Sequence, residues 1–415
     1  MRAAVAILGL ALTLAGALGC RNNTLLDFAM ASAPRASAAL ERIGPWELLA
    51  GDLHAHVLPP DAPYHVSRGL LETVRIAREE HLDFVVLTPH VPARFFLLPE
   101  KREWVRGTQR VLQAQIDAIT RNGTDTSILL VAGMEYTDHR FGHVGLAFAD
   151  VDAVLDELPV GDLADRPELF FERWQAHGGI ATINHPVLRP IATAPVRELR
   201  ADLSWRGFPL PGSAERTPVA PEIRWLSENA QTIETHNASV EHLRDQFFMP
   251  DRDWTLREAT YLLDREARRQ RRRITPVGGS DSHGLWLRPT TWVLASERST
   301  AALRDAIVAG RTCVRGPEAC LLEVRAGDGA SHSVGASIAT TAPVRAISAR
   351  SLRGSATWYV NGVASARSRP GETISLPMSG RCSLVRAAVG RSVSAPIYVD
   401  CPWADTPRDA TLKDG

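Results

Sequence analysis

With 415 residues, the chain is long enough for two domains, or for one large barrel followed by a smaller domain. Its 45% hydrophobic and 23% charged residues are typical of a folded globular protein and exclude an intrinsically disordered one. Because 47 Lys and Arg residues balance 47 Asp and Glu residues, no overall charge favours nucleic acid, and we expect no nucleic-acid partner.

The first 20 residues predict export. Arg2 precedes an apolar run at residues 3–17, which resembles a signal peptide because it is too short to span a bilayer comfortably. Leu18 and Gly19 precede Cys20, as in the bacterial lipoprotein signal, whose cysteine becomes the acylated first residue. We therefore expect a lipid anchor on Cys20 and a location in the periplasm or at the outer membrane. Plain secretion after another cleavage site is the alternative.

Residues 21–45 are rich in Ala and Ser and predict a tether. From residue 46 to residue 312, short apolar runs alternate with segments of helical pattern. Strands are expected at 48–53, 84–88, 128–134, 144–147, 180–184, 231–235 and 275–279, and helices at 67–80, 102–121, 168–177, 239–246, 255–270 and 299–309. Strands separated by helices pair in parallel, so this part is expected to be an α/β domain.

The remaining segments differ in character. Residues 189–226 are rich in Pro and Arg and predict an irregular insertion near the site, and residues 406–415 predict a disordered tail. At 313–405, short β-prone runs between Gly, Ser and Pro turns predict a small β-sandwich. This part contains Cys313, Cys320, Cys382 and Cys401. An even number of cysteines in an exported protein indicates disulfides, with three possible pairings, and buried free thiols are the alternative.

Side chains that bind metal ions lie at the ends of the expected strands. In chain order they are Asp52, His54 and His56 after the first, His90 after the second, Glu135 after the third, His143 before the fourth, His185 after the fifth, Glu234 and Asn237 after the sixth, and Asp281 and His283 after the seventh. The carboxyl ends of parallel strands meet on one rim. A single histidine would more often be structural, but so many at equivalent positions predict a metal centre.

The spacing within two motifs has a physical reason. On an extended segment, His54 and His56 point to the same face, so both imidazoles reach one ion. Asp281 and His283 repeat this arrangement with a carboxylate and an imidazole. Mixed nitrogen and oxygen ligands suit zinc, manganese or iron and disfavour calcium and magnesium. We therefore expect two or three divalent ions of the former kinds.

At these motifs, over roughly residues 50–290, the chain resembles the PHP superfamily, named for its polymerase-associated and histidinol-phosphatase members. Within it, Gly142-His143, the motif Gly278-Gly279-Ser280-Asp281-Ser282-His283 and the later Ala395-Pro396-Ile397-Tyr398-Val399 resemble the carbaryl-hydrolase-like branch. The resemblance implies a seven-stranded (β/α) barrel, a distorted TIM barrel of the PHP type, with a trinuclear metal centre. The small β-sandwich would follow it.

The resemblance also implies a ligand set. His54, His56, Glu135 and Asp281 would hold one metal, Glu135 would bridge to a second that is held also by His143 and His185, and Asp61, His90 and His283 would hold the third. Asp52, Glu234 and Asn237 would lie beside the ligands without contacting the metals.

Two departures from the family pattern affect the predicted site of the third metal. Pro89 replaces the Asp of the usual Thr-Asp-His, which removes an acceptor that would orient neighbouring ligands. Pro60-Asp61-Ala62 replaces the usual Ser-Asp-Gly, and His65 is an alternative ligand to Asp61. At the second metal, His139 is an alternative to His143.

The expected activity is metal-dependent hydrolysis of a phosphate mono- or diester of a small molecule. Two close ions that share a hydroxide lower its pKa and place it for attack, and no Ser or Cys lies in an activating motif. Asp281 or His283 is expected to transfer a proton to the leaving group. Cleavage of a carbamate or carboxylic ester is the alternative reaction. A surface lipoprotein that binds metal or glycan without catalysis is the third hypothesis.

Overall fold

The computed structural model describes residues 42–121, 127–159, 161–187, 204–208, 219–241, 253–326, 329–340, 346–378 and 382–404. The predicted signal peptide, the predicted lipidation site Cys20, most of the tether and the predicted tail lie outside these residues. Most of the predicted insertion at 189–226 and the second half of the helix predicted at 239–246 also lie outside them. Each helix in the described ranges is too short or too polar to cross a membrane.

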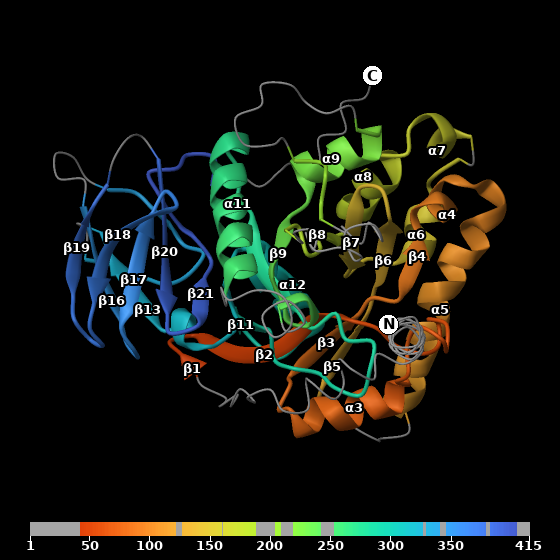
Figure 1. The fold of residues 1–415 in the computed structure, drawn as a ribbon, viewed down its shortest axis with the longest axis horizontal. Helices are drawn as coiled ribbons and strands as arrows, with labels where there is room; N and C mark the ends of the chain where they lie inside the picture. Colours follow the sequence, from red (N-terminus) through yellow and green to blue (C-terminus); the bar gives the residue numbers. More distant parts are fainter. Residues whose placement is uncertain are drawn as a thin grey trace, which may run out of the picture.

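Strands and helices alternate up to residue 308, which confirms the α/β prediction (Figure 1). The strands are β1 (Arg42–Ile43), β2 (Trp46–Ala55), β3 (Phe84–Leu87), β4 (His90–Pro92), β5 (Leu129–Ala132), β6 (Met134–Asp138), β7 (Gly142–Ala147), β8 (Ile180–Ile183), β9 (Thr232–Asn237), β10 (Thr275–Gly279) and β11 (Thr291–Ala295). The helices are α3 (Leu70–Glu79), α4 (Ala93–Leu97), α5 (Arg102–Arg121), α6 (Val151–Asp156), α7 (Asp162–Asp165), α8 (Leu169–Ala176), α9 (Pro221–Asn229), α11 (Trp254–Gln270) and α12 (Thr300–Val308), with a 3-10 helix at Pro99–Lys101.

These strands divide between two sheets. A six-stranded sheet has the order β10-β9-β8-β7-β6-β4, in which β7 runs antiparallel to both of its neighbours and the other pairs are parallel. In a twelve-stranded sheet, β2, β3 and β5 pair in parallel and β11 joins β2 in the antiparallel sense.

The two sheets are joined at two places, one on each side of the α/β part. On one side, β5 ends and β6 begins at Gly133, where a Cβ atom would lie 2.6 Å from the carbonyl oxygen of Leu146, so only glycine fits. On the other side, the amide of Asp281 donates to the carbonyl of His54 (2.7 Å), and the amide of His56 donates to the carbonyl of Ser282 (3.1 Å). These bonds bring the ends of β2 and β10 together.

Amphipathic helices cover the strands. In α5, the buried residues Val105, Leu112, Ile116 and Ile119 recur at helical spacing, and the last three pack in one apolar cluster with Val85. The exposed face of α5 is mostly polar, although Trp104 and Val111 are also exposed. This spacing explains why these residues form a helix. The helix packs against the strands because its apolar stripe would otherwise be exposed to water.

The C-terminal part consists mainly of strands, with a 3-10 helix at Glu318–Cys320. A four-stranded sheet contains β13 (Leu322–Arg325), β14 (Ser331–His332), β16 (Ala346–Ser351) and β19 (Ile374–Pro377), and the large sheet contains β12 (Thr312–Val314), β15 (Ser337–Ile338), β17 (Ala356–Val360), β18 (Val363–Ser368), β20 (Ser383–Val389), β21 (Ser392–Ser394) and β22 (Ile397–Val399). Trp358 is fully buried in the apolar cluster of this part. The predicted boundary at residue 313 falls within β12, which pairs with both β11 and β21.

One sheet therefore runs from the mixed part into the β-rich part, and helix α11 lies between the two in Figure 1. Arg386 of β20 donates to Asp264 of α11 (Nε to Oδ2, 2.7 Å), and both side chains are buried. The hydroxyl of Tyr398 accepts from the amide of Ile274. A closed seven-stranded barrel followed by a separate sandwich stays a prediction.

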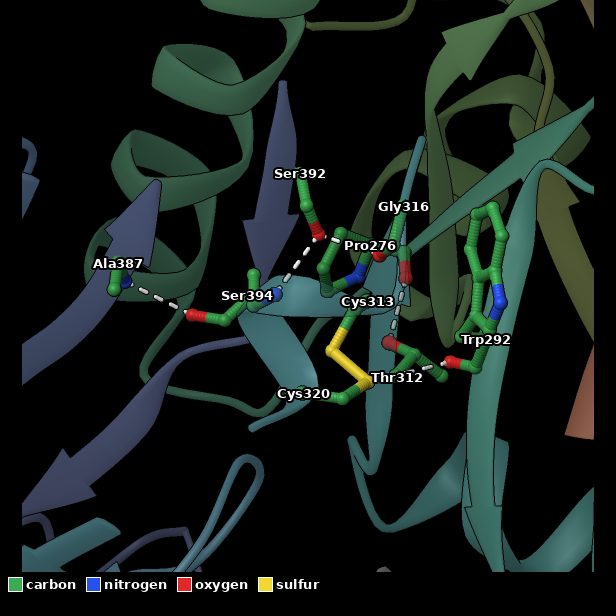
Figure 2. The surroundings of a disulfide bond; sticks show 10 residues. Pro276, Trp292, Thr312, Cys313, Gly316, Cys320, Ala387, Ser392 and Ser394 are labelled. Carbon is green, nitrogen blue, oxygen red and sulfur yellow. Dashed lines mark hydrogen bonds between the residues drawn. A yellow bond between two sulfur atoms is a disulfide. The ribbon is translucent and has the colours of Figure 1, made fainter. Parts of the chain in front are cut away.

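Two disulfides stabilise the β-rich part. Cys313 pairs with Cys320, and Cys382 pairs with Cys401. Figure 2 shows the first bond beside Thr312, whose hydroxyl donates to the carbonyl of Pro276 (2.7 Å). The bond therefore lies where β12 crosses from one part of the chain to the other.

Candidate metal centre

The predicted ligands come together at the ends of strands from both sheets. His54 lies in β2 with His56 just after it, His90 begins β4, Glu135 lies in β6, His143 lies in β7, His185 follows β8, and Asp281 and His283 follow β10. Most of these side chains are buried. His90, Asp281 and His283 keep partial exposure, so they lie on the solvent side of the cluster.

Three groups of potential ligand atoms form within this cluster. In each group, one atom per residue lies within 4.8 Å of the others, and the groups are His54, His56 and Glu135; Glu135, His143 and His185; and His56, His90 and His283. Glu135 belongs to two groups, and so does His56. The three potential sites are therefore neighbours that share side chains. The individual ligand roles stay predictions.

Asp281 lies between the first and third groups. Its Oδ1 is 3.2 Å from Nε2 of His56, 3.5 Å from Nε2 of His54 and 3.7 Å from Nδ1 of His283. The Nδ1 atom of His283 also lies 3.0 Å from the backbone carbonyl oxygen of Asp281. The structure thus brings both predicted catalytic residues to the partly exposed side of the cluster.

Asp61 contacts ring nitrogens on their Nδ1 side. Its Oδ2 lies 3.2 Å from Nδ1 of His56, and its Oδ1 lies 2.9 Å from Nδ1 of His90. The Oδ1 atom also accepts from the amide of His90 (3.0 Å). A carboxylate in this position fixes the orientation of both rings and leaves their Nε2 atoms directed elsewhere. Asp61 lies outside the three groups, and its predicted role as a ligand stays a prediction.

Glu234 contacts two predicted ligands and the neighbouring Asn237. Its Oε1 lies 3.0 Å from Nδ1 of His54, and its Oε2 accepts from the amide of His185 (2.7 Å) and from Nδ2 of Asn237 (3.0 Å). The same Asn237 amide group donates to Oδ2 of Asp281 (3.2 Å). Glu234 and Asn237 therefore lie beside the predicted ligands.

Asp52 supports the backbone of the first motif. Its Oδ1 accepts from the amides of His54 (3.1 Å) and Ser280 (2.9 Å), which links the strand β2 to the loop after β10. Complete burial raises the pKa of Asp52 to about 6, and the hydrogen bonds from Ser280 and His54 oppose this shift. The carboxylate thus acts on the backbone that carries the ligands.

Two predicted ligands have strained backbone. Asp281 has a φ of 52° and His185 a φ of 28°, in the region that only glycine adopts readily. Each such residue costs about 1–3 kcal/mol and persists only where its surroundings hold it. The bond from the Asp281 amide to the His54 carbonyl and the bond from the His185 amide to Glu234 provide this support.

The close approach of carboxylates and imidazoles in the cluster shifts the pKa values of both. Burial opposes ionisation of Glu135, but the imidazoles of His143 and His54 hold the pKa of this carboxyl well below its usual range. Burial likewise opposes protonation of His56, but hydrogen bonds to Asp281 and Asp61 raise the pKa of His56 to about 9. The carboxylates thus favour positive charge on the rings of His54 and His56. A divalent ion supplies that charge when it displaces the protons from its ligands.

The donor set fits such ions. Imidazole nitrogens and carboxylate oxygens are the ligands of zinc, manganese and iron sites. Facing nitrogens lie close together, with 3.3 Å between Nε2 of His54 and Nε2 of His56. Among the described residues, Nε2 of His143 and Nδ1 of His185 are buried without a hydrogen-bond partner. The residues therefore suit metal ions by chemistry and by proximity.

The two alternative ligands lie at the edge of the cluster. The ring of His65 stacks on that of His90 with 4.4 Å between centroids, and the ring of His139 lies 6.1 Å from that of His143. Both side chains are exposed, and neither belongs to the three groups. The structure places His143 in a group and leaves His139 outside.

Sequence reasoning missed a residue that orients Glu135. The side-chain amide of Asn184 donates to Oε1 of Glu135 (2.9 Å), and the hydroxyl of Thr137 lies 3.5 Å from Oε2. Asn184 directly precedes His185, so its place in a ligand motif was a signal that could have identified it.

Arg68 was also missed. This side chain is fully buried and donates to the carbonyls of His56 (2.9 Å), Gly284 (2.6 Å) and Trp286 (2.7 Å) and to the hydroxyl of Ser282 (2.9 Å). It therefore joins the loop after β2 to the loop after β10. Because these loops carry His56 and His283, Arg68 fixes the distance between ligands of the third group.

Comparison with known proteins gave structural similarities alone. No family model and no curated protein matches the chain. A two-domain protein from Bacteroides vulgatus, which contains a predicted PHP-like metal-dependent phosphoesterase, is similar over 88% of this chain and 97% of its own, with 16% identity and a TM-score of 0.43. A lesion-specific endonuclease from Pyrococcus furiosus is similar over 69% of this chain and 64% of its own, with 12% identity and a TM-score of 0.34. At such low TM-scores, neither similarity supports a conclusion about function.

Substitution of the shared carboxylate tests the centre. Glu135→Gln removes the negative charge from two of the three groups, so we expect metal affinity to fall by more than about 100-fold. Elemental analysis after dialysis against a metal buffer measures the bound ions per chain. Glu157→Gln, which changes an exposed carboxylate near His177, should keep the full content. Equal metal content in both variants would contradict a site at Glu135.

Arg68 is expected to act through the position of its neighbours. In Arg68→Lys a single ammonium replaces the guanidinium fork, so affinity for the ion of the third group should fall by about 10- to 100-fold. Cobalt titration followed by visible absorption measures this loss. Arg102→Lys is the control, because Arg102 is also buried and donates to the carbonyls of Leu158 and Pro159. Equal cobalt affinity in the two variants would show that Arg68 merely stabilises the fold.

Proposed function

We propose that this protein is a metal-dependent hydrolase that cleaves a phosphate mono- or diester of a small molecule. The observation that carries the proposal is the position of Glu135, which belongs to two adjacent groups of potential ligands. A carboxylate shared in this way suits a centre with more than one ion. The PHP-type barrel implied by the sequence motifs would be the scaffold.

Different residues of the chain would hold the ions and orient the ligands. His54, His56, Glu135, His143 and His185 would hold two ions, and His90 and His283 would contribute to a third, because Nε2 of His56 serves only one ion. Divalent ions in such a centre lower the pKa of bound water and neutralise charge that develops on phosphoryl oxygens. Glu234, Asp61 and Asn184 keep the ligands in their orientations through the hydrogen bonds described above. The buried position of most ligands excludes bulk water from the inner part of the centre.

We assign proton transfer to the partly exposed residues of the cluster, His283 and Asp281. The side chain of His283 is 13% exposed and that of Asp281 17% exposed, whereas Glu135 is 1% exposed. Both lie at the solvent side, where a leaving group departs. We propose that, in a centre of two ions, where Nε2 of His283 is not a metal ligand, this nitrogen gives a proton to the leaving oxygen, and that Asp281 orients the ring through the contact between its backbone carbonyl and His283 Nδ1.

Export and anchoring complete the proposal. The signal-like N-terminus and Cys20 support a lipid-anchored protein of the periplasm or outer membrane. The two disulfides of the β-rich part fit this oxidising environment. The balanced charge of the chain supports small-molecule esters as substrates in place of nucleic acid.

Removal of the metal tests the reaction class. Treatment with a chelator should lower the hydrolysis of 4-nitrophenyl phosphate or bis(4-nitrophenyl) phosphate by at least about 100-fold, and added manganese or zinc should restore it. Faster turnover of 4-nitrophenyl acetate or an aryl carbamate than of either phosphate would favour the alternative ester hydrolase. A full metal content with no turnover of any of these would favour a binding protein.

The proton donor is tested with two leaving groups. Nitrophenolate leaves without a proton, whereas an alkoxide needs one, so His283→Asn should slow an alkyl phosphate by about 100-fold or more beyond its effect on 4-nitrophenyl phosphate. Measurement of kcat for both esters at equal metal content gives this ratio. A similar loss for both esters would show that His283 serves as a ligand and not as the acid.

A further inference from the structure

A series of nearly parallel rings leads from the metal centre to the surface. The ring of His56 lies 4.0 Å from that of His90 at 17°, and the ring of His90 lies 4.4 Å from that of His65 at 19°. The ring of Tyr64 continues the series at 6.4 Å from His65 and 8°. His56 is buried, whereas the side chain of Tyr64 is 70% exposed. The last two rings are thus outside the ligand groups and open to solvent.

The loop that carries these outer rings is fixed to the loop after β10. The amide of Ser67 donates to the carbonyl of His283 (3.0 Å), and Arg68 binds the carbonyl of Gly284. The ring of His65 itself lies 4.8 Å from that of His283. Tyr64 and His65 therefore have a defined position relative to the candidate ligands.

The second loop adds an exposed apolar side chain. Leu285 follows His283 by two residues and is 57% exposed, although its neighbour Trp286 is almost completely buried. Leu285 thus adds apolar surface to the loop that also carries the candidate ligand His283. Ligand sites typically combine a few polar groups that fix the reacting end with apolar and aromatic groups that contact the remainder.

We propose that Tyr64 and His65, with Leu285 of the neighbouring loop, form a subsite for a planar aromatic group attached to the phosphoryl group. The inference rests on the proposed function, because the metal centre must hold the phosphoryl end. The substrate class is then an aryl phosphate ester. Flat rings stack with a parallel offset, so the exposed face of Tyr64 favours an aromatic group over an aliphatic one of equal size.

Three phosphonates test this subsite without any turnover. Isothermal titration calorimetry of the manganese-loaded protein measures Kd for phenylphosphonate, cyclohexylphosphonate and methylphosphonate. We expect phenylphosphonate to bind most tightly. Tyr64→Ala should weaken it by about two- to tenfold and leave methylphosphonate unchanged. Tyr64→Phe should keep the affinity, and so should Tyr261→Ala, which removes an exposed tyrosine from α11.

Each other outcome overturns the subsite. Equal losses for phenylphosphonate and methylphosphonate would show that Tyr64 acts on the ion centre. The phenyl and cyclohexyl compounds could bind with the same Kd and lose the same affinity in Tyr64→Ala. That result would show an apolar surface with no aromatic preference. If phenylphosphonate binds no more tightly than methylphosphonate, the proposed aromatic subsite is wrong, whereas the proposed phosphoryl site at the metal centre is supported. If no phosphonate binds the metal-loaded protein, the proposed function fails and the subsite with it.

Discussion

The burial of carboxylates among imidazoles is the constraint on which the rest of this structure depends. An ionised carboxylate removed from water costs several kcal/mol unless other groups compensate it. Glu135 is buried and Asp281 is partly buried, and ring nitrogens of His54, His56 and His143 lie within 3.3 Å of their carboxylate oxygens. Shared cations compensate this arrangement better than protons do, because one ion satisfies several ligands at once.

The backbone around the centre is arranged to keep the ligands in place. Asp281 and His185 adopt positive φ angles, and hydrogen bonds from their own amides hold them there. Arg68 and Asp52 join the end of β2 to the loop after β10. The ligand positions thus depend on contacts between segments that lie far apart in the chain.

Much of this could be predicted from the sequence, and the reasons differ by feature. Helix α5 has the predicted bounds, 102–121, because its apolar residues keep a helical period over several turns. The continuation of β5 into β6 was not resolved as two strands, because the change of sheet at Gly133 depends on the close approach of Leu146. Arg68 was not identified, since its partners at 282–286 lie over 200 residues away and leave no local pattern. The disulfide pairing was equally inaccessible to reasoning from spacing.

Anomalous diffraction at the zinc and manganese edges, from crystals of the metal-loaded protein, tests the central claim most directly. The account predicts at least two peaks in the cluster, with imidazole nitrogens at about 2.0–2.2 Å from them and Glu135 in contact with both. A crystal that contains the metal but shows no peak among these side chains would contradict it. Separations of His54, Glu135 and His185 too large for a shared centre would contradict it equally.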